Sequence, residues 1–226
     1  MNLEYQEYFK RQIELFGEEK QLKLLKKKIL IVGAGGLGCS VGIGLGGSGI
    51  GEIDFVDFDE VSFSNLHRQI AFGQNDLGNF KVQTLAKRIK EKNPFVKIKT
   101  FKLKFEEFIK KQTPKYDLIL DATDNLQTRK EIDKWAKSSN TPWIYASVEE
   151  WRGQVCFFEK SSFEVFANKS HSPKGIAAPM VMEVGAFEAN LALRYLVNLP
   201  IQKDTLFFMY YNNKGEYILK NFKMPT

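Results

Sequence analysis

The apolar positions of this chain fall into short runs that alternate with longer segments, in which apolar residues recur every three or four positions. The short runs are typical of strands buried on both faces of a parallel sheet, and the longer segments are typical of amphipathic helices. The pattern predicts strands at residues 29–32, 53–56, 96–101, 116–120 and 143–147. It predicts helices within residues 3–27, with a break at Gly17, and at residues 39–47, 79–92, 104–111, 126–138 and 181–196.

The pattern changes after Arg152, where strand-like runs follow with turns such as residues 212–215, and with the polar loop at 167–179 and the helix at 181–196 between the second and third runs. These runs, at residues 154–158, 163–166, 206–211 and 217–219, indicate antiparallel strands. The predicted fold class is α/β: a Rossmann-like nucleotide-binding sheet, parallel at the N-terminal side and continued by antiparallel strands, with N-terminal helices. We expect one domain over residues 1–226, divided into N-terminal helices (1–27), a nucleotide-binding half (28–150) and a mixed-sheet half (151–226) that contains a polar loop at 167–179.

Composition narrows the classes of partner and compartment. The chain has 226 residues, 43% of them hydrophobic, and a net charge of +6. Its lysines cluster at residues 26–28, 87–92 and 97–111 on predicted helix faces and edges, which favours a solvated surface, or one suited to an acidic protein, over nucleic-acid binding. Two distant cysteines, no signal peptide and no apolar stretch of roughly 18 residues predict a cytoplasmic protein without a membrane span.

Four glycines stand between the first predicted strand and the following helix, at Gly33, Gly35, Gly36 and Gly38. The next strand closes on Asp57. A strand, a glycine turn, a helix and a strand ending on an acid describe a nucleotide-binding unit, because glycines let the backbone approach phosphates while the acid binds ribose hydroxyls. The glycines alone are also compatible with close helix packing, and such a motif usually indicates a nicotinamide or flavin dinucleotide.

Four further motifs make the pattern more specific. They are Tyr8-Phe9-Lys10-Arg11-Gln12-Ile13, Ser64-Asn65-Leu66-His67-Arg68, Gly78-Asn79-Phe80-Lys81 and Ala122-Thr123-Asp124-Asn125. Together with the glycine turn they resemble the signature of the ThiF/MoeB/HesA superfamily, relatives of the ubiquitin-activating enzymes that adenylate the C-terminal glycine of a small ubiquitin-like protein. The resemblance covers most of the chain, through Trp151-Arg152-Gly153-Gln154 and Gly175-Ile176-Ala177-Ala178-Pro179.

The resemblance implies ATP and Mg²⁺ as cofactors, and it implies roles for particular residues. The implied nucleotide-binding residues are Gly33, Gly35, Gly36, Gly38, Asp57, Asp59, Ser64, Asn65, Leu66, His67, Arg68, Lys81, Asp124 and Asn125. Arg11, Arg68, Lys81 and Asp124 would be catalytic, with Asp124 as the metal ligand and Arg11 reaching the nucleotide site of the other subunit of a homodimer. Taken without the family, Arg11 is an exposed helical arginine, and Asn65 or Asp124 is a helix or loop N-cap. Asp121 is the less favoured metal ligand.

The chain departs from the family in its sulfur chemistry. It lacks the two Cys-x-x-Cys pairs that bind a structural zinc in many relatives, so no zinc is expected. Thiamin-pathway members carry a cysteine in the crossover loop, the loop at 167–179, where this chain has His171. Cys39 and Cys156 fit buried small residues better than nucleophiles. We therefore expect sulfur to come from a separate persulfide-bearing protein.

The function that the resemblance implies is ATP-dependent adenylation of the C-terminal Gly-Gly of a ubiquitin-like sulfur carrier, ThiS-like and serving thiamin thiazole biosynthesis. MoeB-like activation of a molybdopterin-synthase subunit is the close alternative, because both groups share every motif quoted. Two other classes stay open: an NAD(P)-binding oxidoreductase and a non-catalytic scaffold that pairs with an active partner. Neither accounts as well for the set of Arg11, Arg68, Lys81 and Asp124.

Overall fold

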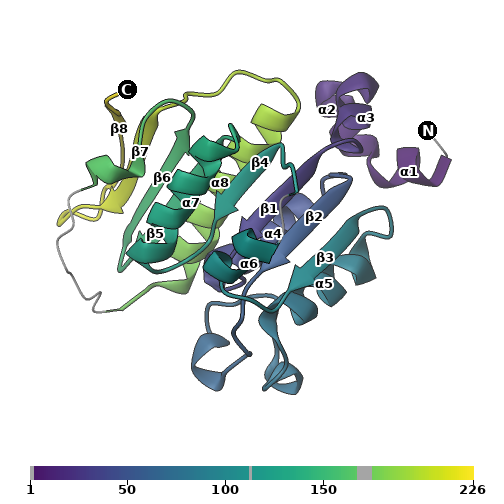
Figure 1. Ribbon diagram of the computed structural model, residues 1–226, viewed down its shortest axis with the longest axis horizontal. Coiled ribbons are helices and arrows are strands. Elements are labelled where there is room, and N and C mark those ends of the chain that lie inside the picture. The colour runs from purple at the N-terminus through teal and green to yellow at the C-terminus, as the bar shows by residue number, and fades with distance from the viewer. Residues whose placement is uncertain (1–2, 112–113, 167–174) are drawn as a thin grey trace.

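A computed structural model describes residues 3–111, 114–166 and 175–226. Its strands form one sheet in the order β3-β2-β1-β4-β5-β6-β7-β8 (Figure 1). The pairs from β3 to β5 are parallel and those from β5 to β8 are antiparallel. The strands are β1 (Lys28–Val32), β2 (Glu52–Val56), β3 (Lys97–Phe101), β4 (Leu118–Asp121), β5 (Trp143–Glu149), β6 (Arg152–Phe158), β7 (Thr205–Tyr211) and β8 (Tyr217–Lys223). The predicted fold class is confirmed.

The helices also follow the predicted segments. They are α1 (Leu3–Tyr8), α2 (Lys10–Phe16), α3 (Glu18–Leu24), α4 (Gly36–Gly46), α5 (Lys81–Lys92), α6 (Phe105–Lys111), α7 (Leu126–Ser138) and α8 (Ala178–Leu196). Gly17 separates α2 from α3 with a φ of 89°, a value that suits glycine and confirms the predicted break. No helix in the described ranges combines the length and apolar character needed to cross a membrane.

One predicted strand is wrong. Residues 163–166 form a 3₁₀ turn (Phe163–Val165) rather than a strand, and the Ser162 hydroxyl accepts a hydrogen bond from the Glu164 backbone N–H at its start. The ring of Phe163 is buried against Trp143 and Phe158. Its apolar character therefore serves an aromatic cluster, and the alternation of apolar and polar residues in so short a segment does not distinguish the two structures.

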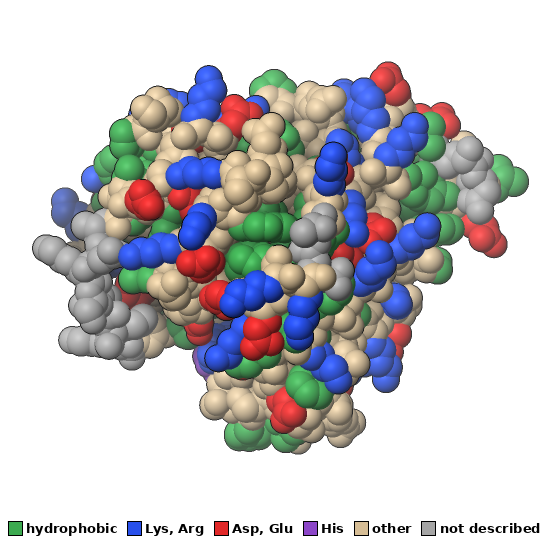
Figure 2. Space-filling model, in the orientation of Figure 1, with side chains coloured by type: hydrophobic (Ala, Val, Ile, Leu, Met, Phe, Trp, Pro, Cys, Tyr) green, Lys and Arg blue, Asp and Glu red, His purple; other side chains and the backbone are tan. Residues whose placement is uncertain are grey.

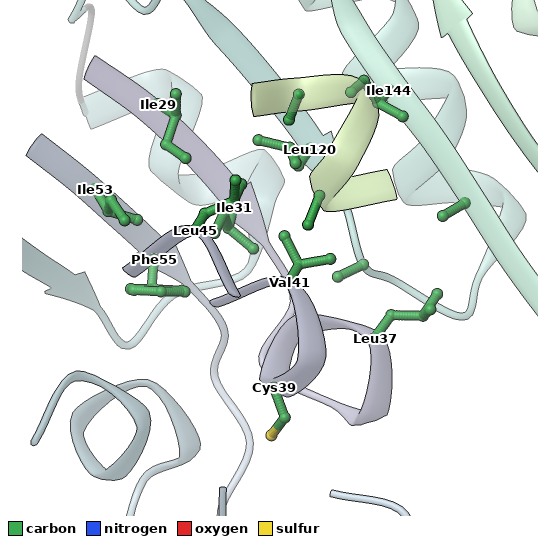
Figure 3. Packing of buried hydrophobic residues seen from close by; sticks show 14 of the residues in the cluster. Ile29, Ile31, Leu37, Cys39, Val41, Leu45, Ile53, Phe55, Leu120 and Ile144 are labelled. Carbon is green, nitrogen blue, oxygen red and sulfur yellow. The ribbon is translucent and has the colours of Figure 1, made fainter. Parts of the chain in front are cut away.

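Helices cover both faces of the parallel strands. Ile29 and Ile31 of β1 point to the face covered by α4 and α8, where they meet Val41 and Leu45 of α4 (Figure 3). Leu30, the residue between them in β1, points to the face covered by α6 and α7. A strand buried on both faces needs apolar residues at every position, and full burial of one such side chain contributes about 1.5–3 kcal/mol.

The two ends of the parallel strands have different surroundings. The N-terminal helices lie where β1 and β2 begin, and the Gln12 side chain of α2 donates a hydrogen bond to the Ser48 carbonyl, 2.6 Å away (Figure 1). At the opposite end of the sheet, loops follow the carboxyl ends of the parallel strands. On the face with α6 and α7, basic side chains are spread with acidic ones between them (Figure 2). In such a sheet, a ligand site is expected at the carboxyl ends of the parallel strands.

Candidate active site

A cleft of about 1320 Å³ follows the carboxyl ends of the strands. At one end it is lined by the segments after β1, β2 and β4, including Gly33, Asp57 and Asp124. At the other it is lined by side chains of β5, β6 and β7, including Gln154 and Phe208. One cavity thus joins the parallel half of the sheet to the antiparallel half.

The glycine turn forms the floor of the first end. Gly33 has a φ of 97°, and a Cβ there would lie 2.6 Å from the Ala122 carbonyl oxygen, so the position requires glycine. Gly35 and Gly36 line the cleft, and the N-terminus of the 11-residue helix α4 opens beside them. Gly38 is buried, and a Cβ there would collide with the Gly33 carbonyl, so it allows close packing within the turn. Free backbone N–H groups and the helix dipole make this end suitable for an anion.

Asp57 ties the end of β2 to the glycine turn. Its Oδ2 accepts a hydrogen bond from the Ala34 backbone N–H at 2.6 Å, and its Oδ1 accepts one from the Asp59 N–H at 2.7 Å. Burial raises the pKa of Asp57, and these two hydrogen bonds act in the opposite direction. Each carboxylate oxygen can accept a second hydrogen bond, so the side chain retains capacity for a ligand hydroxyl.

Two cations face the same end. Lys81, the first residue of α5, is almost fully buried, and its Nζ lies 2.7 Å from Oδ2 of the half-exposed Asp59. Arg68 donates to the Ser64 carbonyl at 3.2 Å and has Nη1 2.8 Å from His67 Nε2. A lysine at a helix N-terminus is opposed by the helix dipole, and a bound anion would relieve that repulsion.

Two carboxylates three residues apart have different environments. Asp121 is fully buried, and its oxygens accept hydrogen bonds from Thr123 and Arg129. Asp124 is exposed in the cleft and makes no hydrogen bond or ion pair with any described residue. The N-cap of α7 is Asn125, whose Oδ1 accepts from the Thr128 N–H at 2.8 Å. The expectation that Asp124 could cap this helix is therefore wrong, and Asp124 is the carboxylate free to bind a ligand.

A divalent cation fits this end of the cleft only together with a ligand of its own. Within residues 3–111, 114–166 and 175–226, no three His, Cys, Asp or Glu side chains come together to hold a metal ion. Mg²⁺ is usually bound by one or two carboxylates plus substrate phosphates. The carboxylate of Asp124, which has no partner among the described residues, fits that arrangement.

The structure gathers most of the predicted site residues but not all of them. Ser64 and His67 are exposed, Leu66 packs against the core and Gly38 is buried within the turn, so none of the four lines the cleft. Arg11 is 94% exposed at the far end of the sheet, paired with Glu14 at 3.1 Å. The predicted residues that do line the cleft are Gly33, Gly35, Gly36, Asp57, Asp59, Asn65, Arg68, Lys81, Asp124 and Asn125. Their roles stay predictions.

Sequence reasoning missed the wall at the other end of the cleft. Tyr145 and Ser147 of β5, Arg152 and Gln154 of β6 and Phe208 of β7 contribute to it. The period of two along each strand puts these residues on one face, but their meeting depends on strand register. No pattern marked Arg129 either, since a cation one turn into a helix is usually solvated.

The thiols of Cys39 and Cys156 are both buried. Burial raises the pKa of each thiol to about 12. The prediction that both are buried small residues is confirmed, and so high a pKa disfavours a role as nucleophile at neutral pH. His171 and most of the loop at 167–179 lie outside the described residues, while Ala178 and Pro179 belong to α8.

Fold and cleft together define an α/β protein in which a glycine turn, two cations and a free carboxylate face one site at the ends of parallel strands. The ThiF family profile matches residues 9–226. The chain belongs to the ThiF family, and the predicted family resemblance is confirmed.

Curated relatives of several kinds match the chain. The molybdopterin-synthase adenylyltransferase of Haemophilus influenzae is 30% identical over 227 residues, which cover 96% of this chain and 91% of that protein. The sulfur carrier protein ThiS adenylyltransferase of Escherichia coli is 32% identical over 187 residues, covering 78% and 74%. The adenylyltransferase and sulfurtransferase MOCS3 of Dictyostelium discoideum is 31% identical over 194 residues and is longer, so the chain spans only 46% of it. All three are named as adenylyltransferases, the class of enzyme that the sequence predicts.

Solved structures agree with the fold. A crystal structure of PaaA superimposes with a TM-score of 0.85 at 20% identity, covering 99% of this chain and 75% of that one. At an identity this low, the similarity shows the fold and carries no argument about the chemistry.

Proposed function

We propose that this protein is an ATP-dependent adenylyltransferase that activates the C-terminal glycine carboxylate of a ubiquitin-like sulfur carrier. The observation that carries the proposal is a cleft with one end suited to an anion and one open end. The glycine turn, Arg68, Lys81 and the partner-free Asp124 lie at the first end. The second end runs along β6 and β7, where an extended peptide would fit.

The reaction needs little acid–base chemistry. A glycine carboxylate is ionised at neutral pH, so its oxygen attacks the α-phosphorus of ATP directly, while the bond from that phosphorus to the bridging oxygen breaks and pyrophosphate leaves. Catalysis then consists of positioning and of neutralising phosphate charge. Arg68 and Lys81 supply positive charge, and the backbone N–H groups of the glycine turn and of α4 supply donors.

Asp57 and Asp124 would hold the rest of the nucleotide. Asp57 has room for ribose hydroxyls beside its two backbone hydrogen bonds. Asp124 would bind Mg²⁺, which when bound to the phosphates neutralises the charge that develops on the leaving pyrophosphate. This assignment rests on Asp124 having no partner among the described residues.

The position of Arg11 supports a shared site in a homodimer. Arg11 lies at the end of the sheet where β1 and β2 begin, so it cannot reach the cleft of its own chain in this arrangement. Its guanidinium is 94% exposed, and it could exchange the surface ion pair with Glu14 for the cleft of a second copy. We propose that it acts there on the phosphates, in trans.

The sulfur step requires another protein. The two cysteines of the sequence are buried thiols with raised pKa values, so neither is placed to attack an acyl-adenylate. A separate persulfide-bearing donor would attack the activated glycine instead. We propose a ThiS-like carrier of thiamin biosynthesis as the substrate, with a molybdopterin-synthase subunit as the alternative; relatives of both kinds match at comparable identity.

The experiment that tests the proposal is ATP–pyrophosphate exchange with one carrier from each pathway, each ending in Gly-Gly. Exchange that depends on the thiamin-pathway carrier alone is the expected result. Exchange with the molybdopterin-pathway carrier alone would keep the adenylyltransferase and replace the carrier. A protein that binds ATP and exchanges with neither would contradict the proposed function, and binding of a nicotinamide dinucleotide in its place would favour an oxidoreductase.

A further inference from the structure

Arg129 is a buried cation that no part of the proposed reaction uses. It lies one turn into α7 and is 6% exposed. Its Nε donates to Asp121 Oδ2 at 3.1 Å, and its Nη2 donates to the Thr123 carbonyl at 2.6 Å. A buried arginine in a protein of this size needs an explanation, because leaving water is costly for a charge.

The contacts of Arg129 with Asp121 and Thr123 fix the loop that leads to Asp124. The Thr123 N–H and hydroxyl both donate to Asp121 Oδ1, at 2.9 and 2.6 Å. Asp121 therefore holds Thr123 from one side while Arg129 holds its carbonyl from the other. Thr123 is the residue before Asp124, so the backbone that presents Asp124 to the cleft is held on both sides.

The second set of contacts reaches the other end of the cleft. Nη2 of Arg129 also lies 3.4 Å from the Ala146 carbonyl, and its guanidinium carbon is 5.1 Å from the centre of the Tyr145 ring. The Tyr145 hydroxyl donates to Gln154 Oε1 at 2.9 Å. Tyr145 and Gln154 line the part of the cleft formed by β5 and β6.

We propose that Arg129 is a positioning residue that sets Asp124 at the nucleotide end of the cleft and the Tyr145–Gln154 wall at the peptide end. This inference rests on the proposed function and deepens it by naming what aligns the two substrates. A planar guanidinium spreads five N–H donors over a fixed fork and can reach two carbonyls and a carboxylate that lie apart, whereas an ammonium carries its three donors on one compact nitrogen. Arg129→Lys keeps the charge and loses the bridge.

The Arg129→Lys variant is tested first by titration calorimetry of ATP at increasing Mg²⁺ and by competition with a synthetic peptide ending in Gly-Gly. We expect the Mg²⁺ concentration needed for ATP binding and the peptide dissociation constant each to rise about five- to tenfold, the upper part of the range for one lost ordinary hydrogen bond. In the exchange assay, saturating Mg²⁺ and carrier should restore most of the rate. A lowered rate at saturation with both affinities unchanged would overturn the proposal.

Two further variants test separately the contacts of Arg129 toward Asp124, the Asp124 arm, and its contacts toward the Tyr145–Gln154 wall. Thr123→Val removes a hydroxyl that bonds Asp121 and is expected to raise only the Mg²⁺ requirement. Tyr145→Phe removes the hydrogen bond to Gln154 and is expected to weaken only peptide binding. If either variant changes both affinities equally, or neither, Arg129 does not act through these contacts; the pair also tests the proposal should Arg129→Lys fail to fold.

Two controls distinguish positioning from general destabilisation. Arg88→Lys alters another arginine clamp, on Asp76 and Ala71 and outside the cleft, and should leave both affinities unchanged. Glu188→Gln is a near-isosteric change of a fully buried carboxyl beside Asp121 and Arg129. Burial and the Asp121 charge raise the pKa of that carboxyl, and the change should likewise leave both affinities unchanged. If the native chain binds MgATP but exchanges with no carrier, the proposed function fails while calorimetry still tests the Asp124 arm.

Discussion

The parallel and antiparallel halves of the sheet are covered differently. β1 and β4 are buried on both faces, and polar residues stand only at their first or last position, as with Lys28 and Asp121. In the antiparallel half, α8 covers one face, while the other leaves Gln154 and Phe208 partly open to the cleft. The half that is buried on both faces can hold groups for a common chemistry, whereas the open half offers a surface for recognising a particular partner.

The largest expected effect is the loss of activity on removing Asp124, which follows a parallel strand. Asp124→Ala should reduce carrier-dependent pyrophosphate exchange on the order of 10²- to 10³-fold, because it removes the proposed Mg²⁺ ligand from the site of developing charge. The melting temperature should be unchanged, since Asp124 has no partner among the described residues. Exchange kinetics and a melting curve check the two halves of this prediction.

Glu131→Ala, a carboxylate on α7 outside the cleft, is the matched control and should keep full activity. Full activity in Asp124→Ala as well would remove Asp124 from the role of metal ligand.

The next largest effect is the loss of activity on removing residues that two copies of the chain would contribute to one site. Arg11→Ala and Lys81→Ala should each lower exchange about 10²-fold, the usual effect of one lost charge-stabilising group. If Arg11 acts in trans in a symmetric dimer, mixing the two dead variants should restore about a quarter of native activity, because half the dimers carry one intact site. Exchange is measured after subunit mixing, and a mixture as inactive as either parent would contradict the shared site.

A substitution in the antiparallel half should affect binding of the carrier rather than of ATP. Phe208→Ala trims a half-buried ring at the peptide end of the cleft and should raise the KM for the carrier about tenfold, or about 1.4 kcal/mol. ATP affinity should not change. Steady-state kinetics with each substrate varied separately checks this, and a matching loss of ATP affinity would mean that the two ends are not separable as described.

The smallest effect is on stability. Glu188 of α8 is fully buried, and its carboxyl oxygens bond no described residue, so burial first and the Asp121 charge second raise its pKa well above the ordinary value. The unfolded chain loses this proton near its ordinary pKa while the folded chain retains it, so rising pH destabilises the fold. Glu188→Gln removes that cost, so its stability relative to the native chain should increase as the pH rises above about 4.3, the ordinary pKa of a glutamate.

Denaturant unfolding of both proteins from pH 4 to pH 8 measures the difference. A constant difference across this range would show that Glu188 ionises in the folded state as it does in the unfolded one.

The comparison of halves also explains what sequence could predict. β1, β2 and the glycine turn are specified locally, by an apolar run and by positions such as Gly33 that only glycine can occupy. The peptide end depends on the antiparallel register of β5, β6 and β7, which brings Tyr145 and Gln154 together across strands. Register of that kind is set by tertiary packing and leaves little trace in one sequence.

The candidate site shows the same division. Asp57 and Lys81 stand in motifs whose spacing follows from one strand or one helix start, and the cleft contains both. Arg11 lies far from the cleft of its own chain, so no reasoning about a single chain could place it there. Arg129 was missed because its burial requires the ends of β4 and β5 to lie beside α7.

The central claim is tested most directly by following a radiolabel in the α-phosphate of ATP. With the native chain and a carrier ending in Gly-Gly, the label should appear on the carrier as an acyl-adenylate, with one pyrophosphate released per label transferred. A carrier lacking its last glycine should receive none. Label that stays in ATP, or that is released as AMP equally fast without any carrier, would contradict the account.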